Sequence, residues 1–325
     1  MAFDVGGISA WTDEISDRAQ ILLTPILGAP SAQYFDKYKD ITGNTIKLPR
    51  LENTPYAQAG TACGFTSSGT TTITQLSLTT SAIKVQEKLC LQDLETYFTK
   101  AWLKSGSSPE TAEIMDIVLK RKLAQVSKKL EQQAWAGKTT YTNDTFWKQL
   151  NGLIHQVDNA GDEIITSGGG AGTALTTANI RTVVEQMIFG DTPSAIADQE
   201  LDLFMGYNHY NVLRQKLWQD NLFHYIPNSS EASSFSFKYP TSNVNIIAVP
   251  GLNNDLSPDA GGVQPTLTKN RMFLTYRGNF AQGFAAENDV NAFDVWYSKD
   301  NQELRMNMRF HIGYGIKDTN LVVAY

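Results

Sequence analysis

Hydrophobic and polar residues alternate most regularly near the C-terminus of the chain. Every second residue from 304 to 312 is apolar, and the polar positions between them are Arg305, Asn307, Arg309 and His311. Successive side chains of a strand point to opposite faces, so this period of two predicts a strand with one buried face. Residues 293–297 supply a partner strand, and 298–301 is typical of a turn. The pattern therefore predicts a two-stranded ribbon.

A hydrophobic strand at 272–276 and a glycine-bounded segment at 278–283 precede this ribbon. No nucleophile, metal cluster or phosphate loop accompanies the strands. A chain with so well specified a sheet and so little visible chemistry is more typical of a structural protein than of a catalyst.

A second alternating pattern lies near the N-terminus. Residues 46–51 and 72–85 alternate as strands, with Leu76, Leu78, Thr80 and Ala82 on one face, and a polar Gly/Thr/Ser stretch separates them at 52–71. Two strands joined by so long a tip predict an extended hairpin arm. Because an isolated hairpin is only marginally stable in water, we expect this arm to lie against another molecule.

Apolar residues then recur at helical spacing. Residues 91–104 predict a short helix. A long helix is predicted from Ser108, which would cap it, and Pro109 to Ala136, just before Gly137. Its apolar stripe is Ile114, Ile117, Val118, Leu123, Val126, Leu130 and Ala134. Its basic residues between 120 and 129 fit either a solvated face or a basic stripe that faces packaged nucleic acid.

Strands and helices interleave in the middle of the chain. The pattern predicts a helix at 177–189, a buried strand at 201–205, a following helix that carries Tyr210, Leu213 and Leu217, and a strand at 244–249. This region is therefore α/β or α+β rather than all-β.

Composition narrows the classes of function. The 325 residues carry a net charge of −6, so the chain has no overall basic signature for nucleic acid. Charged residues make up 18%, below the roughly 25% of average domains. That suits a surface largely covered by neighbours, and it equally suits any Thr-rich β protein. With no secretory signal pattern and no apolar run of about twenty residues, we expect a protein made in the cytoplasm without a membrane span.

Candidate chemistry is sparse in the sequence. Cys63 and Cys90 are expected to be unpaired thiols. The four histidines lack metal-ligand spacing, and the glycine-rich run at 167–172 lacks the Lys-Ser/Thr of a phosphate loop. Asp255 and Asp259 lie in a turn-rich loop, where turn formation is favoured over cation binding. We therefore predict no catalytic, cofactor-binding or metal-binding residues, although a glycosidase-like carboxylate pair stays open.

The order of these elements resembles the major capsid protein of tailed double-stranded DNA bacteriophages, the Hong Kong 97-type fold. The resemblance rests on the arm, hairpin and long helix ending at Trp135-Ala-Gly137, and on later segments along the chain. These segments are Asn151-Gly-Leu-Ile154, Leu201-Asp-Leu-Phe-Met205, Tyr207-Asn-His-Tyr-Asn-Val-Leu213, Leu217-Trp-Gln-Asp-Asn221, Phe273-Leu-Thr-Tyr276, Gly278-Asn279 to Gly283, and Arg305 to Gly313.

The resemblance implies an α+β fold with an N-terminal arm (1–45), an extended hairpin loop (46–90), a peripheral lobe with a spine helix and sheet (91–154 and 266–325) and an axial lobe (155–265). It implies a structural protein, not an enzyme, that self-assembles as hexamers and pentamers into an icosahedral shell. Expected partners are further copies of the chain, a portal and non-specifically contacted DNA, with the host cytoplasm as the place of assembly and the virion capsid as the destination. Tyr56 and Phe65 on the hairpin are candidate assembly contacts, although both would also fit packing within their own loop.

Two features depart from some relatives. No lysine lies between Lys47 and Lys84, so we expect no isopeptide cross-link at the hairpin tip. The long N-terminal scaffolding extension of some relatives is also lacking, which favours a separate scaffolding protein.

Two alternatives stay open at the level of sequence. One is an encapsulin-like nanocompartment shell of the same fold, which would enclose cargo enzymes. The other is a soluble α+β hydrolase, in which an exposed Phe146-Trp147 pair would line a cleft with converging acids.

Overall fold

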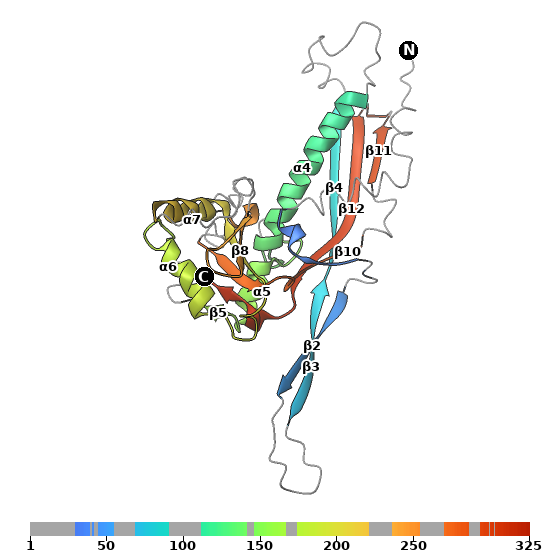
Figure 1. Cartoon of the computed structure of the whole chain (residues 1–325). Helices are drawn as coiled ribbons and strands as arrows, with labels where there is room; N and C mark the ends of the chain where they lie inside the picture. The colour runs from blue at the N-terminus through green and yellow to red at the C-terminus, as the bar shows by residue number, and fades with distance from the viewer. Residues whose placement is uncertain are drawn as a thin grey trace, which may run out of the picture.

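The computed structural model describes residues 30–39, 41, 45–54, 69–90, 112–141, 146–166, 174–220, 236–253, 270–285, 293–298, 300–301 and 303–325. Two β-sheets and the long helix α4 (Ala112–Ala136) form its body, and a two-stranded hairpin projects from one end (Figure 1). The mixed architecture confirms the α+β class predicted from the sequence.

The first sheet is built around the long strand β12 (Glu303–Ile316). One edge of β12 pairs with β4 (Ser81–Cys90), and the other pairs first with β11 (Phe293–Ser298) and then with β10 (Phe280–Ala285). Strand β1 (Asp36–Tyr38) adds to β10 in parallel. The predicted ribbon is confirmed as β11 and β12. The segment at 278–283, which the sequence pattern left without a strand, contributes β10.

The two faces of β12 differ as the period of two predicts. Met306, Met308, Phe310 and Ile312 are buried, whereas Arg309 is exposed and Arg305, Asn307 and His311 are partly exposed. Helix α4 runs alongside β4 and β12 (Figure 1). Val126 and Leu130 of its stripe share one hydrophobic cluster with Phe310 and Ile312, so α4 covers the apolar face of this sheet.

The arm is an antiparallel pair of β2 (Thr45–Thr54) and β3 (Thr70–Thr79) that extends away from the body (Figure 1). The prediction of one strand over 72–85 was wrong. The chain leaves β3 at Thr80 and enters β4, which belongs to the main sheet. This break shifts the phase of burial by one residue, so Ala82 is exposed and Ile83 and Val85 face the core instead.

The second sheet has six strands in the order β5-β13-β9-β6-β8-β7. They are β5 (Ile164–Ile165), β13 (Val323–Ala324), β9 (Met272–Tyr276), β6 (Leu201–Gly206), β8 (Val244–Val249) and β7 (Ser236–Lys238). Every residue of β6 is buried, Asp202 included, as expected for a central strand that is covered on both faces. The predicted strands at 201–205, 244–249 and 272–276 are confirmed.

Helices complete both layers. Helix α6 (Ile180–Glu185) continues into a wider turn, η2 (Gln186–Gly190), and α7 (Tyr207–Gln219) follows β6 directly; both predicted helices are confirmed. Helix α4 ends at Ala136 as predicted, whereas its expected cap at Ser108 and the helix at 91–104 lie outside the described residues. Short elements are η1 (Pro30–Gln33), α5 (Leu153–Ala160), η5 (Pro250–Leu252) and η6 (Thr319–Leu321).

Two hydrophobic clusters underlie the two sheets. One gathers α4, α5, the apolar face of β12 and one face of the six-stranded sheet, and the other gathers α6, α7 and the opposite face of the six-stranded sheet. Strands β9 and β13 come from 266–325, yet they pair within the six-stranded sheet. Residues 273–276, which the resemblance groups with the ribbon in 266–325, therefore belong to a different sheet from the ribbon.

Candidate assembly surfaces and a basic cavity

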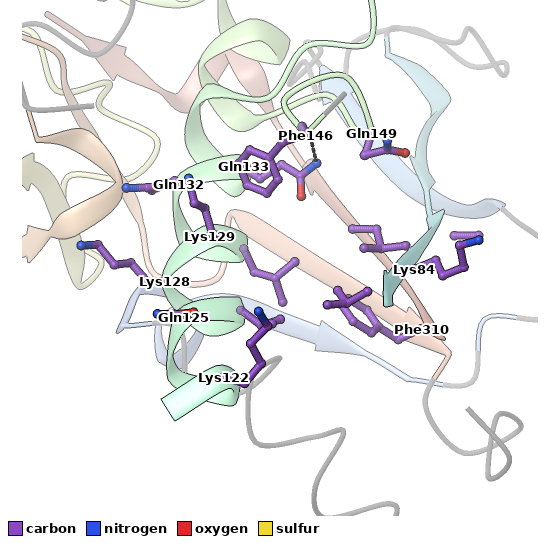
Figure 2. A pocket seen from close by; sticks show the side chains of 15 residues that line it. Lys84, Lys122, Gln125, Lys128, Lys129, Gln132, Gln133, Phe146, Gln149 and Phe310 are labelled. Carbon is purple, nitrogen blue, oxygen red and sulfur yellow. Dashed lines mark hydrogen bonds between the residues drawn. The ribbon is translucent and has the colours of Figure 1, made fainter. Parts of the chain in front are cut away.

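A cavity of about 900 Å³ lies between α4 and strands β4 and β12 (Figure 2). Apolar side chains form part of its wall: Ile83 and Val85 from β4, Val126 and Leu130 from α4, and Phe310 from β12. Four lysines also line it, Lys84 from β4 and Lys122, Lys128 and Lys129 from α4. The cavity therefore combines an apolar surface with a positively charged one.

The lysines of this cavity differ in their partners. Lys122 Nζ lies 2.5 Å from the Glu87 carboxylate, so its charge is balanced within the molecule. Lys129 Nζ lies over the Phe146 ring, 5.0 Å from its centre. Among the described residues, no carboxylate pairs with Lys84, Lys128 or Lys129. The predicted basic residues of the long helix thus contribute two exposed charges, at 128 and 129, that no carboxylate of the described residues balances.

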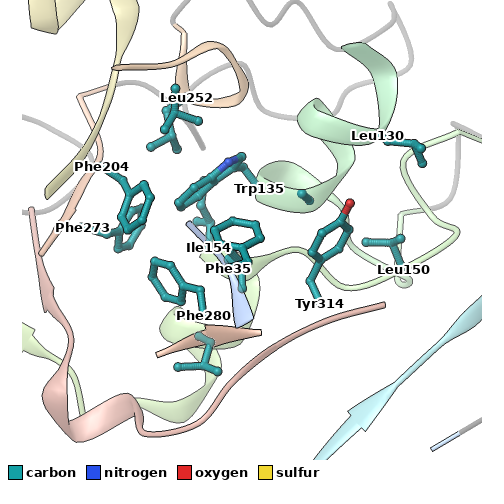
Figure 3. Close-up of a cluster of buried hydrophobic side chains, with 14 of the residues drawn as sticks. Phe35, Leu130, Trp135, Leu150, Ile154, Phe204, Leu252, Phe273, Phe280 and Tyr314 are labelled. Atoms are coloured by element: carbon teal, nitrogen blue, oxygen red, sulfur yellow. The ribbon is translucent and has the colours of Figure 1, made fainter. Parts of the chain in front are cut away.

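The second feature is an aromatic cluster that joins the two sheets (Figure 3). Trp135 at the end of α4 is fully buried, with ring centres of Phe204 and Phe273 at 5.5 and 5.9 Å and that of Phe280 at 5.7 Å. Phe204 and Phe273 come from the six-stranded sheet and Phe280 from the other one. Phe35, from the N-terminal chain, adds a ring at 6.0 Å from Trp135. Aromatic pairs at such distances stabilise beyond their buried area, so this cluster fixes one sheet against the other.

Glu131 is a buried carboxylate one helical turn before Trp135. Its Oε2 accepts hydrogen bonds from the Ser31 backbone N–H at 3.1 Å and the Ser31 hydroxyl at 2.6 Å, and its Oε1 accepts from Trp135 Nε1 at 3.3 Å. Burial raises the pKa of the Glu131 carboxyl, and the bonds from Ser31 and Trp135 oppose that shift. The carboxyl thereby ties the N-terminal chain to α4.

The hairpin is seated on glycines of the main sheet. Leu78 of β3 is fully buried, and a Cβ placed on Gly283 or Gly315 would come within 2.5 or 2.6 Å of its methyl groups. A Cβ on Gly313 would collide with the backbone carbonyl of Thr79. Arg50 of β2 adds an ion pair with Asp318 at 3.2 Å. At the hairpin base the Leu78 side chain therefore packs directly on Gly283 and Gly315, and the backbone of Thr79 approaches Gly313 more closely than a side chain there would allow.

Beyond its base the hairpin exposes apolar surface. Ile73 of β3 is 67% exposed, as is Trp218 at the end of α7, while Phe189 is 61% exposed. Contiguous exposed apolar surface marks contact sites, and single exposed residues such as these serve only as candidate positions within such a surface. The arm and the outer end of α7 are thus the candidate contact surfaces.

An ion-pair cluster borders Trp218. Asp220 accepts from Arg181 at 2.8 Å and from Lys216 at 2.9 Å, and Arg181 also pairs with Glu185 at 2.8 Å. Hydrogen bonds from Lys216 and Arg181 lower the pKa of Asp220. The cluster links α6 to the end of α7, so it positions this exposed surface.

The residues predicted as assembly contacts, Tyr56 and Phe65, lie outside the described residues, as do Cys63, Asp255 and Asp259 and the glycine-rich run at 167–172. The polar face of β12 is described. Asn307 accepts a hydrogen bond from Gln86 at 3.2 Å, and Glu303 pairs with Lys88 at 3.1 Å. Part of that face is therefore satisfied by β4 of the same chain.

Among the described residues, the features expected of a hydrolase cleft are not gathered in one place. Trp147 is 5% exposed and its ring packs against Phe146, so the expectation of an exposed aromatic pair was wrong. Burial raises the pKa of both Asp202 and Glu131. Asp202, however, accepts hydrogen bonds from Arg277 and Asn245, which are not partners of Glu131, so the two acids do not share one site. Among the described residues no three His, Cys, Asp or Glu side chains are placed to hold a metal ion, and no helix is long and apolar enough to cross a membrane.

Two of the described histidines, His155 and His209, have altered surroundings. Burial lowers the pKa of His209, and a hydrogen bond with Asn270 partly opposes that change. Burial and the positive charge of Lys138 lower the pKa of His155. Both changes favour the neutral ring. The structural roles of Glu131 and of the three sheet glycines were missed in the sequence. Neither spacing nor composition shows which side chains contact these residues in the fold.

Two packed sheets, one long helix across the first sheet and a projecting hairpin make up a fold that is similar to those of solved phage structures. A chain of the satellite phage P4 procapsid, a structure that includes the size determination (Sid) protein, matches 94% of this chain and 89% of its own, with a TM-score of 0.58 and 12% identity. A chain from Gordonia phage Cozz matches at 91% and 86%, with a TM-score of 0.58 and 12% identity.

A chain from the capsid of an empty GTA particle matches 91% of this chain and 88% of its own, with a TM-score of 0.54 and 9% identity. The sequence matches no protein-family model and no curated protein sequence. The likeness at these identities is one of fold, and it extends over nearly the whole of each chain. It confirms the capsid fold predicted from the sequence and is consistent with the Hong Kong 97-type architecture.

Proposed function

We propose that this chain is the major capsid protein of a tailed bacteriophage, which self-assembles into an icosahedral shell around double-stranded DNA. The observation that carries the proposal is the match over 94% of the chain to a subunit of a phage procapsid, with a second match to a capsid particle at 91%. A match of this extent leaves little of the chain for a separate function.

The exposed surfaces support a role in repeated contacts between copies. The hairpin projects from the body (Figure 1) and carries the exposed Ile73, and α7 carries the exposed Trp218 near its C-terminal end. We propose that the hairpin, with Tyr56 and Phe65 near its tip, crosses a neighbouring copy. The lobe around α7, roughly residues 155–265, would surround the symmetry axes of hexamers and pentamers, and the lobe of α4 and the ribbon would lie at their periphery.

Further partners belong to this proposal. A portal and a separate scaffolding protein would take part in assembly, which we expect in the host cytoplasm, and DNA would be contacted without sequence specificity. The role is structural and not enzymatic. The nanocompartment alternative is less well supported, since the matched particles are phage and GTA capsids.

Sedimentation and negative-stain electron microscopy test this function. The protein is expressed alone and together with the genes that flank it. We expect large particles of uniform size in at least one of the two preparations, and nuclease-protected DNA in particles recovered from infected or induced cells. Material that sediments only as single chains in every preparation would contradict the proposal, and particles filled with a cargo enzyme in place of DNA would favour the nanocompartment.

A further inference from the structure

The basic cavity between α4 and β4 has the chemistry of a site for an acidic, partly apolar peptide. Its apolar wall includes Val85, Val126 and Phe310, and its exposed lysines are Lys84, Lys128 and Lys129. A DNA backbone would use the lysines but would leave the apolar wall uncovered. A segment that carries carboxylates beside apolar side chains uses both, because each part of the surface then meets its complement.

Gln133 is a second, independent observation that points to a ligand with a hydrogen-bond donor in this cavity. It is 1% exposed and lines the cavity; its amide nitrogen donates to the Phe146 carbonyl at 2.8 Å (Figure 2). Its Oε1 is buried and has no hydrogen-bond partner among the described residues. A buried acceptor left unpaired is unfavourable, so a donor supplied by an occupant would remove that penalty.

The N-terminal sequence of this chain has the matching composition. Residues 11–17 read Trp-Thr-Asp-Glu-Ile-Ser-Asp, with carboxylates at Asp13, Glu14 and Asp17 and apolar side chains at Trp11 and Ile15. Spacing of four residues puts Trp11 and Ile15 on one side of a helical turn. The indole N–H of Trp11 and the backbone N–H groups are donors of the kind that Gln133 lacks.

The described chain begins where such a segment can reach the cavity. Ser31 is bound to Glu131 on α4, and Lys129 lies two residues before Glu131. At 3.6 residues per turn these two side chains point to nearly opposite sides of the helix, which is about 10–12 Å across. Residues 18–29 form a connection that spans up to about 40 Å when extended, so it can pass around α4 with length to spare.

A competing segment fits less well. Residues 91–111 also lie outside the described residues, but their ends are fixed because they connect β4 to α4. Their charges are nearly balanced, with Asp93, Glu95 and Glu110 set against Lys100 and Lys104. Residues 11–17 carry three carboxylates and no basic residue.

We propose that residues 11–17 dock in the basic cavity of their own chain, with Asp13, Glu14 and Asp17 against Lys84, Lys128 and Lys129, and Trp11 and Ile15 against the apolar wall. Docking would hold the N-terminal segment on the side of α4 opposite Ser31. The inference concerns the single chain, so it stands whether or not shells form.

Hydrogen exchange in the full-length protein tests this docking. Amides 11–17 are expected to exchange at least about tenfold more slowly in the wild-type chain than in a Lys128→Glu/Lys129→Glu variant, because charge reversal opens the segment. Lys37→Glu/Lys39→Glu is the matched control: both lysines are exposed, lie outside the cavity and give the same change of charge. Adding Asp13→Lys/Glu14→Lys to the cavity variant should restore protection.

Zero-length carbodiimide cross-linking of the wild-type protein gives a second readout that needs no variant. We expect isopeptide bonds from Asp13, Glu14 or Asp17 to Lys84, Lys128 or Lys129. A mixture of isotope-labelled and unlabelled protein identifies the chain of origin, and bonds between labelled and unlabelled chains would overturn the intrachain assignment. Equal exchange of amides 11–17 in all variants, or protection of these lysines by a short DNA duplex alone, would overturn the docking itself.

Discussion

Ser31 and Glu131 form the contact that joins the start of the described chain to its longest helix. Both the backbone N–H and the hydroxyl of Ser31 donate to Oε2 of Glu131, at 3.1 and 2.6 Å. The other carboxylate oxygen accepts from Trp135, the residue around which aromatic side chains from both sheets gather. One buried carboxylate therefore couples the N-terminal chain, α4 and the interface between the sheets.

This carboxylate makes stability depend on pH in a defined direction. Burial raises the pKa of Glu131, so its contribution to stability is fully present below the ordinary glutamate pKa and is lost as pH rises through the folded-state value. Glu131→Gln keeps an acceptor for Trp135 and removes the charge. We expect the free energy of unfolding of this variant to increase relative to that of the wild type as pH rises from about 4 to about 8.

Denaturant unfolding at several pH values measures this difference. Glu200→Gln, at a side chain that is 63% exposed, controls for the loss of one carboxylate. A stability difference between Glu131→Gln and wild type that stays constant over the whole pH range would contradict the account.

Two residues on the same strand of the hairpin separate folding from assembly. Leu78 is fully buried against Gly283 and Gly315, whereas Ile73 is 67% exposed. Leu78→Ala should lower the free energy of unfolding by about 2–5 kcal/mol, because it leaves a cavity at the seat of the arm. Ile73→Ala should change it by less than about 0.5 kcal/mol and reduce particle yield. An Ile73→Ala protein that assembles as wild type would argue against an intermolecular role for this part of the arm.

Adjacent residues of α7 allow the same comparison at the other surface. Trp218 is 67% exposed and Leu217 is fully buried. Trp218→Ala should leave the melting temperature nearly unchanged and shift material from particles to smaller species, since it removes only surface available to a neighbour. Leu217→Ala should lower the melting temperature directly. Sedimentation with parallel thermal melts distinguishes the two, and unchanged particle yield with Trp218→Ala would remove α7 from the proposed contact.

The hairpin should remain free of covalent cross-links. No lysine occurs between Lys47 and Lys84, so the tip lacks the amine that an isopeptide bond requires. Purified particles boiled in denaturant should run as a single band at the 36.0 kDa of the chain. A ladder of higher bands resistant to reducing agent would contradict this prediction.

Sequence periodicity was sufficient for the regular elements. The ribbon at β11 and β12, the buried strands β6, β8 and β9, and the end of α4 at Ala136 follow from local patterns, and the structure confirms them. The ribbon and the helix bury one face or one stripe, whereas β6 and β8 are buried on both faces, and each kind of burial leaves its own pattern in the residue order.

The parts that were missed depend on contacts between distant residues. The break at Thr80 leaves alternation intact on either side, so a shift of one residue between β3 and β4 is not visible in the pattern. Strand β10 contains Gly283, which reads as a loop residue until Leu78 is placed against it. Trp147 is buried by packing near the end of α4, and the partners of Glu131 lie a hundred positions away. The lysines of the cavity were recognised as a basic stripe, whereas the apolar wall beside them required the fold.

Cryo-electron microscopy of the purified particles tests the central claim most directly. The account predicts closed icosahedral shells whose subunit has α4 across the five-stranded sheet and the β2–β3 hairpin lying on a neighbouring subunit. A protein that yields no closed particles, alone or with the products of its flanking genes, would contradict the claim, as would shells in which the hairpin contacts only its own chain.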